Sequence, residues 1–349
     1  MNRTMLVKEA KASALEWVLE KGRLTPGFVG ANFAGSVNSL LDDATFPATS
    51  DLDVMLVLEN PEDALKPGKF IFRGALLEAS YIARDALRSP EAVLGNVHLA
   101  GGFRTQSVIL DPTGMLTALH EVVSREFARR RWVRRRCESA EEVVRSYGRA
   151  LSEAVPLHDQ VAMTAFAAGV TTFVLLAAGM KNPTVRKRYA AARDLLAAYG
   201  MLDFHEPLLA LLGCAEMPRE RVEHHLKGVA EAFDAAKVAI RTPYRFGSDI
   251  SDAARPISID GSWELIERGL HREAVFWLVA THSRCRHIFS TDAPELLSHF
   301  DPSFRELLAD LGIDSFHDRQ LRCREVEAFL PQLWTVAEEI LAANPDIRD

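Results

Sequence analysis

The sequence predicts an α+β fold, with a mixed sheet in the first part of the chain and helices through the rest. Short β-branched and apolar runs, bounded by glycine and proline, occur before residue 115. After that point apolar residues recur with the spacing of helices as far as residue 345. Strands that come first and helices that follow are typical of an α+β protein, because α/β units would interleave the two.

The first part of the chain is expected to fold around short strands. Gly22 and Pro26 end the first predicted helix, and the apolar run after Asp51 has the β-branched character of a buried strand. The expected elements are a helix over 4–22, a strand over 28–33, a short helix over 36–41, a loop over 42–50, and strands over 51–59, 69–82 and 107–110. These strands form the predicted mixed sheet.

The rest of the chain reads as helices joined by turns. Expected helices cover 115–136, 139–153, 157–180, 184–199, 204–213 and 217–240, and 262–345 is again helical. Prolines and glycines make 241–261 a predicted linker or long loop. The predicted domains are therefore 1–115 with the sheet, 116–241 as a helical bundle, and 242–349 as a helical extension.

Composition excludes several classes of protein. The 349 residues include 48% hydrophobic and 26% charged residues, an ordinary globular balance. The net charge of -7 gives no general attraction for nucleic acid. No C-x-x-C spacing occurs, which argues against a disulfide framework or a zinc ribbon. We expect reduced, buried thiols at the four cysteines, which are Cys137, Cys214, Cys285 and Cys323.

One stretch approaches the length of a membrane span. Val161 to Met180 is apolar but contains three threonines and is closed by His158, Asp159 and Lys181. We read it as a buried core helix. With no apolar signal core near the start, we expect a cytoplasmic protein without membrane contact. The sequence leaves open whether the protein is a monomer or a homodimer.

Two carboxylates lie together at the start of a predicted strand. Asp51 and Asp53 are two residues apart, so strand alternation places both side chains on one face. Their charges repel, and a cation between them relieves the repulsion. Carboxylate oxygens suit Mg²⁺, which keeps room in its shell for substrate phosphates. The alternative is a solvated strand start that binds nothing.

A phosphate-binding pattern precedes this pair. Gly35 permits close backbone approach, and Ser36 opens a short predicted helix. The combined pattern, F-A-G-S, a spacer, then S-D-L-D-V-M-L-V-L, resembles the nucleotidyltransferase superfamily. It is most similar to the kanamycin-type aminoglycoside nucleotidyltransferases, over about residues 25–240. The resemblance implies that 1–115 is a nucleotidyltransferase domain.

The resemblance also implies a third carboxylate beside the aspartates. Glu78, in L-L-E-A-S-Y, is the expected residue, and Asp111, in V-I-L-D-P-T-G, is its rival. Asp51, Asp53 and Glu78 are thus the expected catalytic residues and ligands of one or two Mg²⁺ ions. Gly35 and Ser36 are expected to bind the nucleotide, together with Arg149.

A helix over 141–149 resembles the family helix that faces the active site. Arg149 stands where the family has a basic residue near the phosphates. Arg145 stands where the family has a glutamate that acts as general base, and a guanidinium cannot take that role. Glu141 and Glu142 lie one turn away. The general base is therefore not assigned.

These expectations define a reaction. The protein is expected to move a nucleoside monophosphate from a nucleoside triphosphate, ATP in the first instance, to a hydroxyl of a small molecule such as an aminoglycoside-like antibiotic. A non-catalytic relative that binds a nucleotide is the first alternative, suggested by Arg145. An enzyme that modifies protein or RNA is the second, suggested by the arginine run 129–136. A solvated helix face is the simpler interpretation of that run.

Two histidine-containing motifs lie outside the residues assigned to the expected site. His282, Cys285 and His287 lie close in sequence, but helical spacing separates His287 from the other two, so we do not expect them to share a metal. His224 and His225 are expected on a helix surface.

Overall fold

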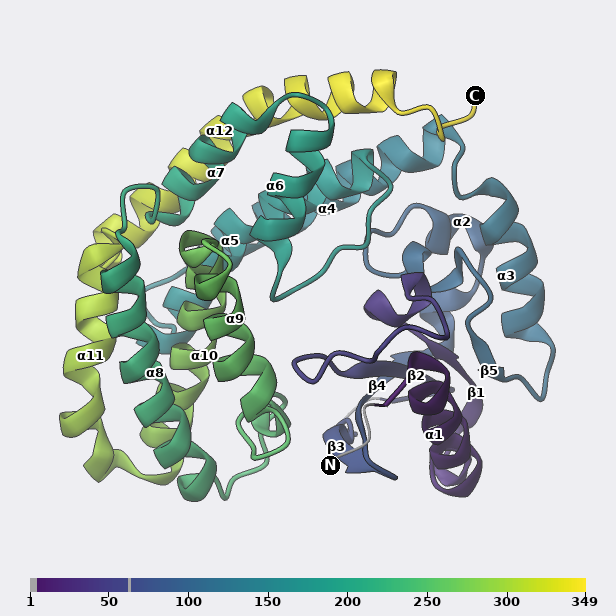
Figure 1. Ribbon diagram of the computed structural model, residues 1–349, viewed down its shortest axis with the longest axis horizontal. Coiled ribbons are helices and arrows are strands. Elements are labelled where there is room, and N and C mark those ends of the chain that lie inside the picture. Colours follow the sequence, from purple (N-terminus) through teal and green to yellow (C-terminus); the bar gives the residue numbers. More distant parts are fainter. Residues whose placement is uncertain (1–4, 62–63) are drawn as a thin grey trace. The chain divides into compact units, whose positions relative to one another are not determined.

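The computed structural model describes residues 5–61 and 64–349. It confirms an α+β protein, with a five-stranded sheet in the N-terminal part and helices through most of the remainder (Figure 1). Contacts divide the chain into two compact units. Unit 1 comprises the described residues up to 135 together with 243–257 and 348–349, and unit 2 comprises 136–242 and 258–347.

Unit 1 is built around the sheet. Its elements are α1 (Val7–Glu20), η1 (Gly22–Leu24), β1 (Phe28–Phe33), η2 (Gly35–Ser39), β2 (Leu52–Leu58), β3 (Gly68–Phe72), β4 (Ala75–Ala83), η3 (Arg84–Leu87), α2 (Pro90–Leu94), η4 (Ala100–Phe103), β5 (Val108–Leu110), α3 (Met115–Glu126) and η6 (Gly247–Asp249). The strand order is β3-β4-β2-β1-β5. Strands β2 and β4 are parallel, and the other neighbouring pairs are antiparallel.

Alternation along the strands separates a core face from a polar face. Leu52, Val54 and Leu56 of β2 are buried in one cluster with α1 residues such as Ala14 and Val18. Because successive strand residues point to opposite faces, Asp53 lies on the face away from α1. The hydrophobic pattern that seats α1 on the sheet therefore fixes the side on which the acidic residues are displayed.

The prediction of one long strand over 69–82 is wrong. The segment is a hairpin of β3 and β4, in which Phe72 pairs with Ala75. Arg73 and Gly74 both have positive φ, 48° and 84°, the conformation of a two-residue hairpin turn. An arginine at such a position is uncommon, so the turn carries little sequence signal.

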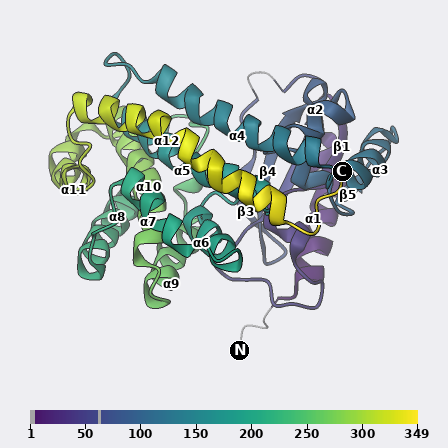
Figure 2. The same cartoon turned by 90° about the horizontal axis from the view of Figure 1, so that it is seen from above.

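Unit 2 is helical. Its elements are the larger part of α4 (Arg130–Ala150), which begins in unit 1, and α5 (Leu157–Ala178), α6 (Arg188–Ala198), η5 (Leu202–Phe204), α7 (His205–Leu212), α8 (Arg219–Ala239), the π-helical turn η7 (Pro256–Asp260), α9 (Gly261–Glu267), α10 (His271–Asp292), η8 (Pro294–Leu296), α11 (Leu297–Asp310) and α12 (Phe316–Ala343). Helix α12 runs beside α5 (Figure 2).

Helix α5 is the core of unit 2. It is apolar on all sides and contacts α6, α7, α10 and α12. By length and composition it could cross a membrane, but 83% of its most apolar window is buried inside the protein. This is the buried helix predicted from the sequence. The four cysteines are free and buried, as expected.

Two segments differ from the helical prediction. Helix 115–136 is interrupted after Glu126, where the Arg130 amide donates to the Arg348 carbonyl at 2.7 Å. The predicted linker 241–261 instead returns to unit 1 through residues 243–257. Both follow from contacts with distant parts of the chain, which local sequence does not encode. The three consecutive domains 1–115, 116–241 and 242–349 stay a prediction.

Candidate functional site

One row of side chains crosses three neighbouring strands of unit 1. Lys69 of β3 is the register partner of Glu78 of β4, and Glu78 is the register partner of Asp53 of β2. Register partners present their side chains to the same face of a sheet. The row therefore places one ammonium group and two carboxylates side by side, on the face away from α1.

Asp51 joins this row from just before β2. It precedes Asp53 by two residues, so its side chain lies on the same face. Carboxylate oxygens of Asp51, Asp53 and Glu78 lie within 4.8 Å of one another. Ligand oxygens on one Mg²⁺ ion lie at most about 4.2 Å apart, so small side-chain movements would let one ion contact all three. The structure thus brings together the three acidic residues that the sequence pattern selected.

Two lysines neutralise part of this charge. The Lys69 ammonium lies 3.0 Å from Asp51 Oδ2 and also contacts Glu78 Oε2. Its side chain is only 7% exposed, so these pairs are shielded from water. The Lys66 ammonium lies 2.5 Å from Glu78 Oε1. Glu78 is therefore held between two cations.

A fourth carboxylate arrives from a distant part of the chain. Asp249, at the end of η6, lies 2.9 Å from the Lys69 ammonium and is buried. Gly68 permits this approach, since its φ is +69° and a Cβ there would overlap the Ser248 hydroxyl. We call the whole group the carboxylate–lysine cluster, which consists of Asp51, Asp53, Lys66, Lys69, Glu78 and Asp249.

The carboxylates of the cluster titrate differently. Burial raises the pKa of Asp53 well above its ordinary value, and the charges of Asp51 and Glu78 raise it further. Burial also raises the pKa of Asp51, against the opposing charge of Lys69. Burial acts on Glu78 in the same direction, but Lys69 and Lys66 outweigh it and lower its pKa to about 2. The repulsion is concentrated on Asp53, where an added cation would stabilise the cluster most.

Gly35 fits closely against the cluster. It has φ +64°, and a Cβ at this position would overlap Asp53 Oδ2. The Ala34 amide donates to the Asp53 carbonyl at 3.0 Å, which continues the pairing of β1 with β2. Ser36 follows in η2 with an exposed side chain. Because Gly35 has no side chain, the main chain after β1 can lie against the Asp53 carboxylate.

Asp111 has a different role. Its Oδ2 accepts hydrogen bonds from the Thr117 amide at 2.8 Å and the Thr117 hydroxyl at 2.9 Å. Burial tends to raise the pKa of Asp111, but these donors lower it. Asp111 therefore stabilises the start of α3. Of the two residues considered as third carboxylate, the structure places Glu78 beside the aspartates.

The residues singled out on α4 interact with one another within unit 2. The Arg145 side chain donates twice to Glu141 Oε1, at 2.8 and 2.6 Å, and Trp334 Nε1 donates to Glu141 Oε2 at 2.6 Å. Arg149 lies 3.4 Å from Glu142 and is largely exposed. Glu141 is thus engaged at both oxygens. The nucleotide-binding role of Arg149 stays a prediction.

The arginine run forms part of a surface cavity in unit 1. The cavity has a volume of about 630 Å³ and is lined by Glu126, Arg129, Arg130, Arg131, Arg134 and Asp349. Arg130 Nε lies 2.7 Å from Asp349 Oδ1, and Arg131 lies 3.4 Å from Glu126. Carboxylates thus accompany these arginines, which fits the interpretation of a paired helix face.

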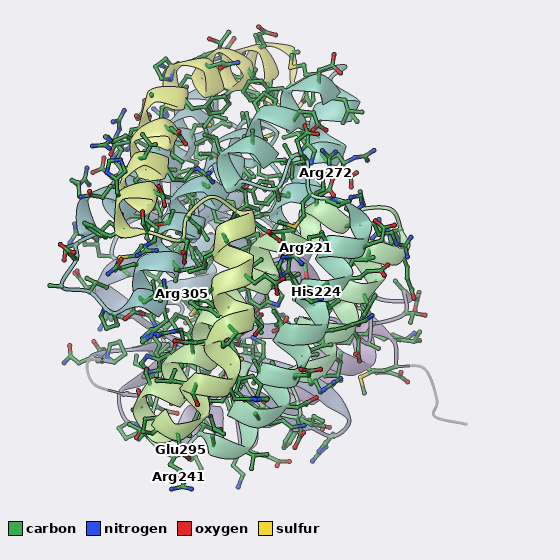
Figure 3. The ribbon with its side chains drawn as sticks, turned by 90° about the vertical axis from the view of Figure 1, so that its left-hand side faces the viewer. Arg221, His224, Arg241, Arg272, Glu295 and Arg305 are labelled. Atoms are coloured by element: carbon green, nitrogen blue, oxygen red, sulfur yellow. The ribbon has the colours of Figure 1, made fainter. Side chains whose placement is uncertain are left out.

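One of the histidines, His225, differs from expectation. His224 is exposed and lies 2.9 Å from Glu306 of α11, next to Arg221 (Figure 3). His225, expected on the surface, is buried and lies 2.7 Å from Asp310. His282 and Cys285 are buried, whereas His287 lies beside His158 of α5. The structure therefore separates His287 from its sequence neighbours and gives it another partner.

Sequence reasoning missed the lysines and Asp249. The predicted single strand over 69–82 contains both Lys69 and Glu78, which hides their pairing across the hairpin. The positive-φ turn at Arg73 and Gly74 sets that register. For Asp249 no local signal exists, since about half of the chain separates it from Lys69.

Comparison with known proteins adds no family to this description. No family model matches the chain, and no curated protein matches it. The function is therefore argued from the geometry of the site.

Proposed function

We propose that the protein is a Mg²⁺-dependent nucleotidyltransferase. It transfers a nucleoside monophosphate from a nucleoside triphosphate, in the first instance ATP, to a hydroxyl of a small molecule, and releases pyrophosphate. An aminoglycoside-like acceptor suits the net charge of -7. The observation that carries this proposal is the convergence of Asp51, Asp53 and Glu78 within 4.8 Å beside Gly35.

The donor set fits a magnesium ion. Carboxylate oxygens are the ligands that Mg²⁺ prefers in proteins. In the cluster, four carboxyl groups face two lysine ammonium groups, so the acidic groups outnumber the basic ones by two. Asp51, Asp53 and Glu78 would hold one or two ions there. When bound, such an ion neutralises charge on the phosphate oxygens.

The protein's own residues supply positioning. Lys66 and Lys69 hold Glu78 ionised and oriented toward Asp53. Gly35 keeps the main chain close to Asp53, where Ser36 and its amide can approach a phosphate. In the reaction the acceptor hydroxyl attacks the α-phosphate, its proton leaves to a base, and the bond to the β-phosphate oxygen breaks in line. Glu141 is paired with Arg145 and Trp334, so we do not assign it as that base.

A second candidate function is nucleotide binding without transfer. Lys69 already occupies the position where a cation would neutralise Asp51 and Glu78. If Lys69 remains there with nucleotide present, the cluster holds no metal and catalyses no transfer.

The deciding experiment is incorporation of label from an α-³²P nucleoside triphosphate. The purified protein is incubated with and without Mg²⁺ and with aminoglycosides, total protein or RNA as acceptors. Asp51→Asn/Asp53→Asn is compared with the exposed pair Asp42→Asn/Asp43→Asn as a matched control. We expect Mg²⁺-dependent label on a small molecule with the native protein and the control. Label that survives Asp51→Asn/Asp53→Asn would overturn the proposed site.

The other acceptors separate the alternatives. Label on protein or RNA would change the acceptor class. Calorimetric binding of ATP without incorporation into any acceptor would favour the binding function. A cytoplasmic location and the choice between monomer and homodimer stay predictions.

A further inference from the structure

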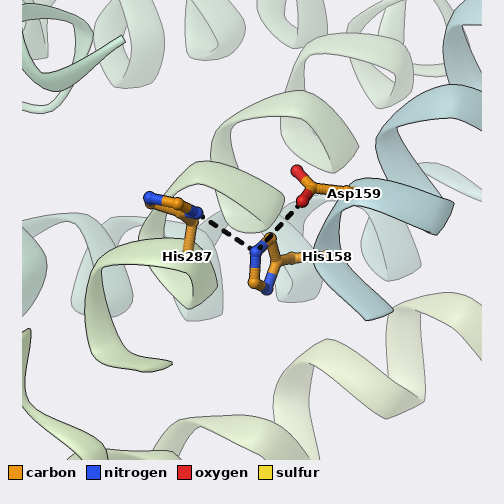
Figure 4. Close-up of side chains that lie close together, drawn as sticks. All are labelled: His158, Asp159 and His287. Carbon is orange, nitrogen blue, oxygen red and sulfur yellow. Dashed lines mark hydrogen bonds and ion pairs between the residues drawn. The ribbon is translucent and has the colours of Figure 1, made fainter. Parts of the chain in front are cut away.

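Unit 2 contains a second group of side chains that can share a metal ion. His158 and Asp159 lie in the first turn of α5, and His287 lies on α10. The His158 Nε2 atom is 3.1 Å from His287 Nδ1 and 3.6 Å from Asp159 Oδ2 (Figure 4). The three ligand atoms lie within 4.8 Å of one another. We propose that they bind a divalent transition-metal ion of the Zn²⁺ class.

The spacing of the three atoms matches such an ion. Tetrahedral zinc with bonds of about 2.0–2.1 Å holds its ligand atoms about 3.3 Å apart. The two distances at His158, 3.1 and 3.6 Å, lie on either side of that value. An ion can therefore enter with small side-chain movements.

The ligand types select the metal. Two imidazole nitrogens and one carboxylate oxygen suit zinc and its neighbours in the transition series, whereas magnesium prefers oxygen ligands alone. This set differs from the carboxylate–lysine cluster of unit 1, which contains no imidazole. The two sites are therefore expected to take different ions.

His158 has the charge that metal binding requires, although its ring proton is on the nitrogen that would bind the ion. Burial lowers the pKa of His158 to about 4, and the charges of His287 and Arg286 lower it against the opposing charge of Asp159. The ring is therefore neutral at pH 7, and a neutral imidazole has one nitrogen lone pair that can bind a metal ion. Its nearly complete burial also fixes the direction of the ring.

Arg286 opposes the metal. Its Nη1 lies 3.5 Å from His158 Nδ1, and because a guanidinium donates only, Nδ1 is the acceptor and the ring proton is on Nε2. Coordination through Nε2 moves that proton to Nδ1, so this contact must open. Asp301 holds Arg286 through Nε and Nη2, at 2.8 and 3.1 Å, and because the guanidinium is planar and rigid this also fixes Nη1. The contact therefore opens when the His158 ring moves or when Arg286 shifts as a whole.

Three protein ligands leave the ion with an open position. The Asp159 side chain is 46% exposed, so water or a small anion can reach the ion from that side. An open position is typical of zinc sites that bind a further ligand rather than of closed structural sites.

The experiment is a titration of the full chain with Co²⁺, whose visible absorption reports coordination, followed by Zn²⁺ competition. Excess Mg²⁺ is present to occupy the carboxylate–lysine cluster. We expect a cobalt spectrum of four or five ligands that Zn²⁺ displaces. His287→Gln and Asp159→Asn are each expected to weaken binding at least about 10-fold. The matched control His317→Gln, at an exposed histidine of α12, is expected to leave it unchanged.

A further variant tests the part played by Arg286. Arg286→Gln removes the opposing charge and is expected to tighten Co²⁺ binding several-fold. Circular dichroism establishes that each variant is folded. Binding that is equal in the native protein, His287→Gln and Asp159→Asn would overturn the proposal, and so would the absence of any visible cobalt spectrum with the native protein.

Discussion

Asp53 and Glu78 face each other directly across the parallel strands β2 and β4. Like charges in direct register destabilise a sheet. Among the described residues, lysines pair with Glu78, and no ion pair to Asp53 is found. This arrangement lowers the stability of the sheet unless a further cation is bound. It is the structural basis of the proposed metal site.

Asp53→Asn is expected to stabilise the protein in the absence of Mg²⁺. A raised pKa means that the folded state binds the Asp53 proton more tightly than the unfolded chain, so stability falls as pH rises from about 3.9 through the folded pKa. Asparagine carries no charge at pH 7, so the variant does not lose the stability that the native protein loses when Asp53 ionises. We expect the free energy of unfolding, measured with urea in EDTA, to rise by on the order of 1 kcal/mol.

The comparison is Asp43→Asn. Lys8 lowers the pKa of the exposed Asp43 through a hydrogen bond, so this aspartate gains nothing from neutralisation. A fall in the stability of Asp53→Asn relative to the native protein would show that Asp53 is satisfied without a metal.

Lys69→Met is expected to make stability dependent on Mg²⁺. Removing the buried ammonium leaves Asp51, Glu78 and Asp249 short of positive charge. The expected loss in EDTA is about 3–5 kcal/mol, the usual cost of breaking a buried ion pair. Mg²⁺ should restore more stability to this variant than it adds to the native protein, which thermal melts with and without the ion would measure.

The control for that variant is Lys8→Met, which removes an exposed lysine paired with Asp43. It is expected to change neither stability nor the Mg²⁺ response. An equal response to Mg²⁺ in Lys69→Met and the native protein would mean that no cation enters the space near Lys69.

Gly35→Ala is expected to damage the metal site more than a turn glycine elsewhere. The added Cβ overlaps Asp53 Oδ2, and the alanine must also adopt a φ of +64°, which is unfavourable for any residue with a side chain. Gly114→Ala meets the same backbone cost, about 1 kcal/mol, but has no atom within 4 Å of its added Cβ. Isothermal titration with Mg²⁺ and ATP should show weakened binding in Gly35→Ala, whereas Gly114→Ala binds like the native protein.

His282→Phe is expected to reduce acid sensitivity. Burial lowers the pKa of His282 to about 3, while the unfolded chain protonates near pH 6.5. Below pH 6.5 the unfolded state therefore binds a proton that the folded state excludes, and stability falls by up to about 1.4 kcal/mol per pH unit. Between pH 6.5 and 5 the native protein should lose about 1.6 kcal/mol more than the variant in urea titrations. His317→Phe, at an exposed position, should retain the native profile.

The sequence predicted those parts of the fold whose determinants are local. Strand alternation placed Asp51 and Asp53 on one face, and the apolar length of α5 indicated a core helix. The strand that carries Glu78 was expected, although its hairpin partner was not. These features depend on periodicity over a few residues, which the sequence shows directly.

The remaining features depend on distant contacts. The irregular segment 243–257, which contains η6, belongs to unit 1 and delivers Asp249 to Lys69. His158 and His287 meet because α5 packs on α10, although 129 residues separate them. Helix periodicity gives the face of each helix but not the partner that the face meets, so neither contact was predictable.

The central claim is that Asp51, Asp53 and Glu78 hold a divalent cation, and a count of bound Mn²⁺ by electron paramagnetic resonance tests it most directly. Mn²⁺ replaces Mg²⁺ in carboxylate sites, and the resonance of the free ion reports what remains unbound. With ATP present, we predict that the native protein binds one or two more ions per chain than Asp51→Asn/Asp53→Asn. Equal numbers of bound ions in the two proteins would contradict the account.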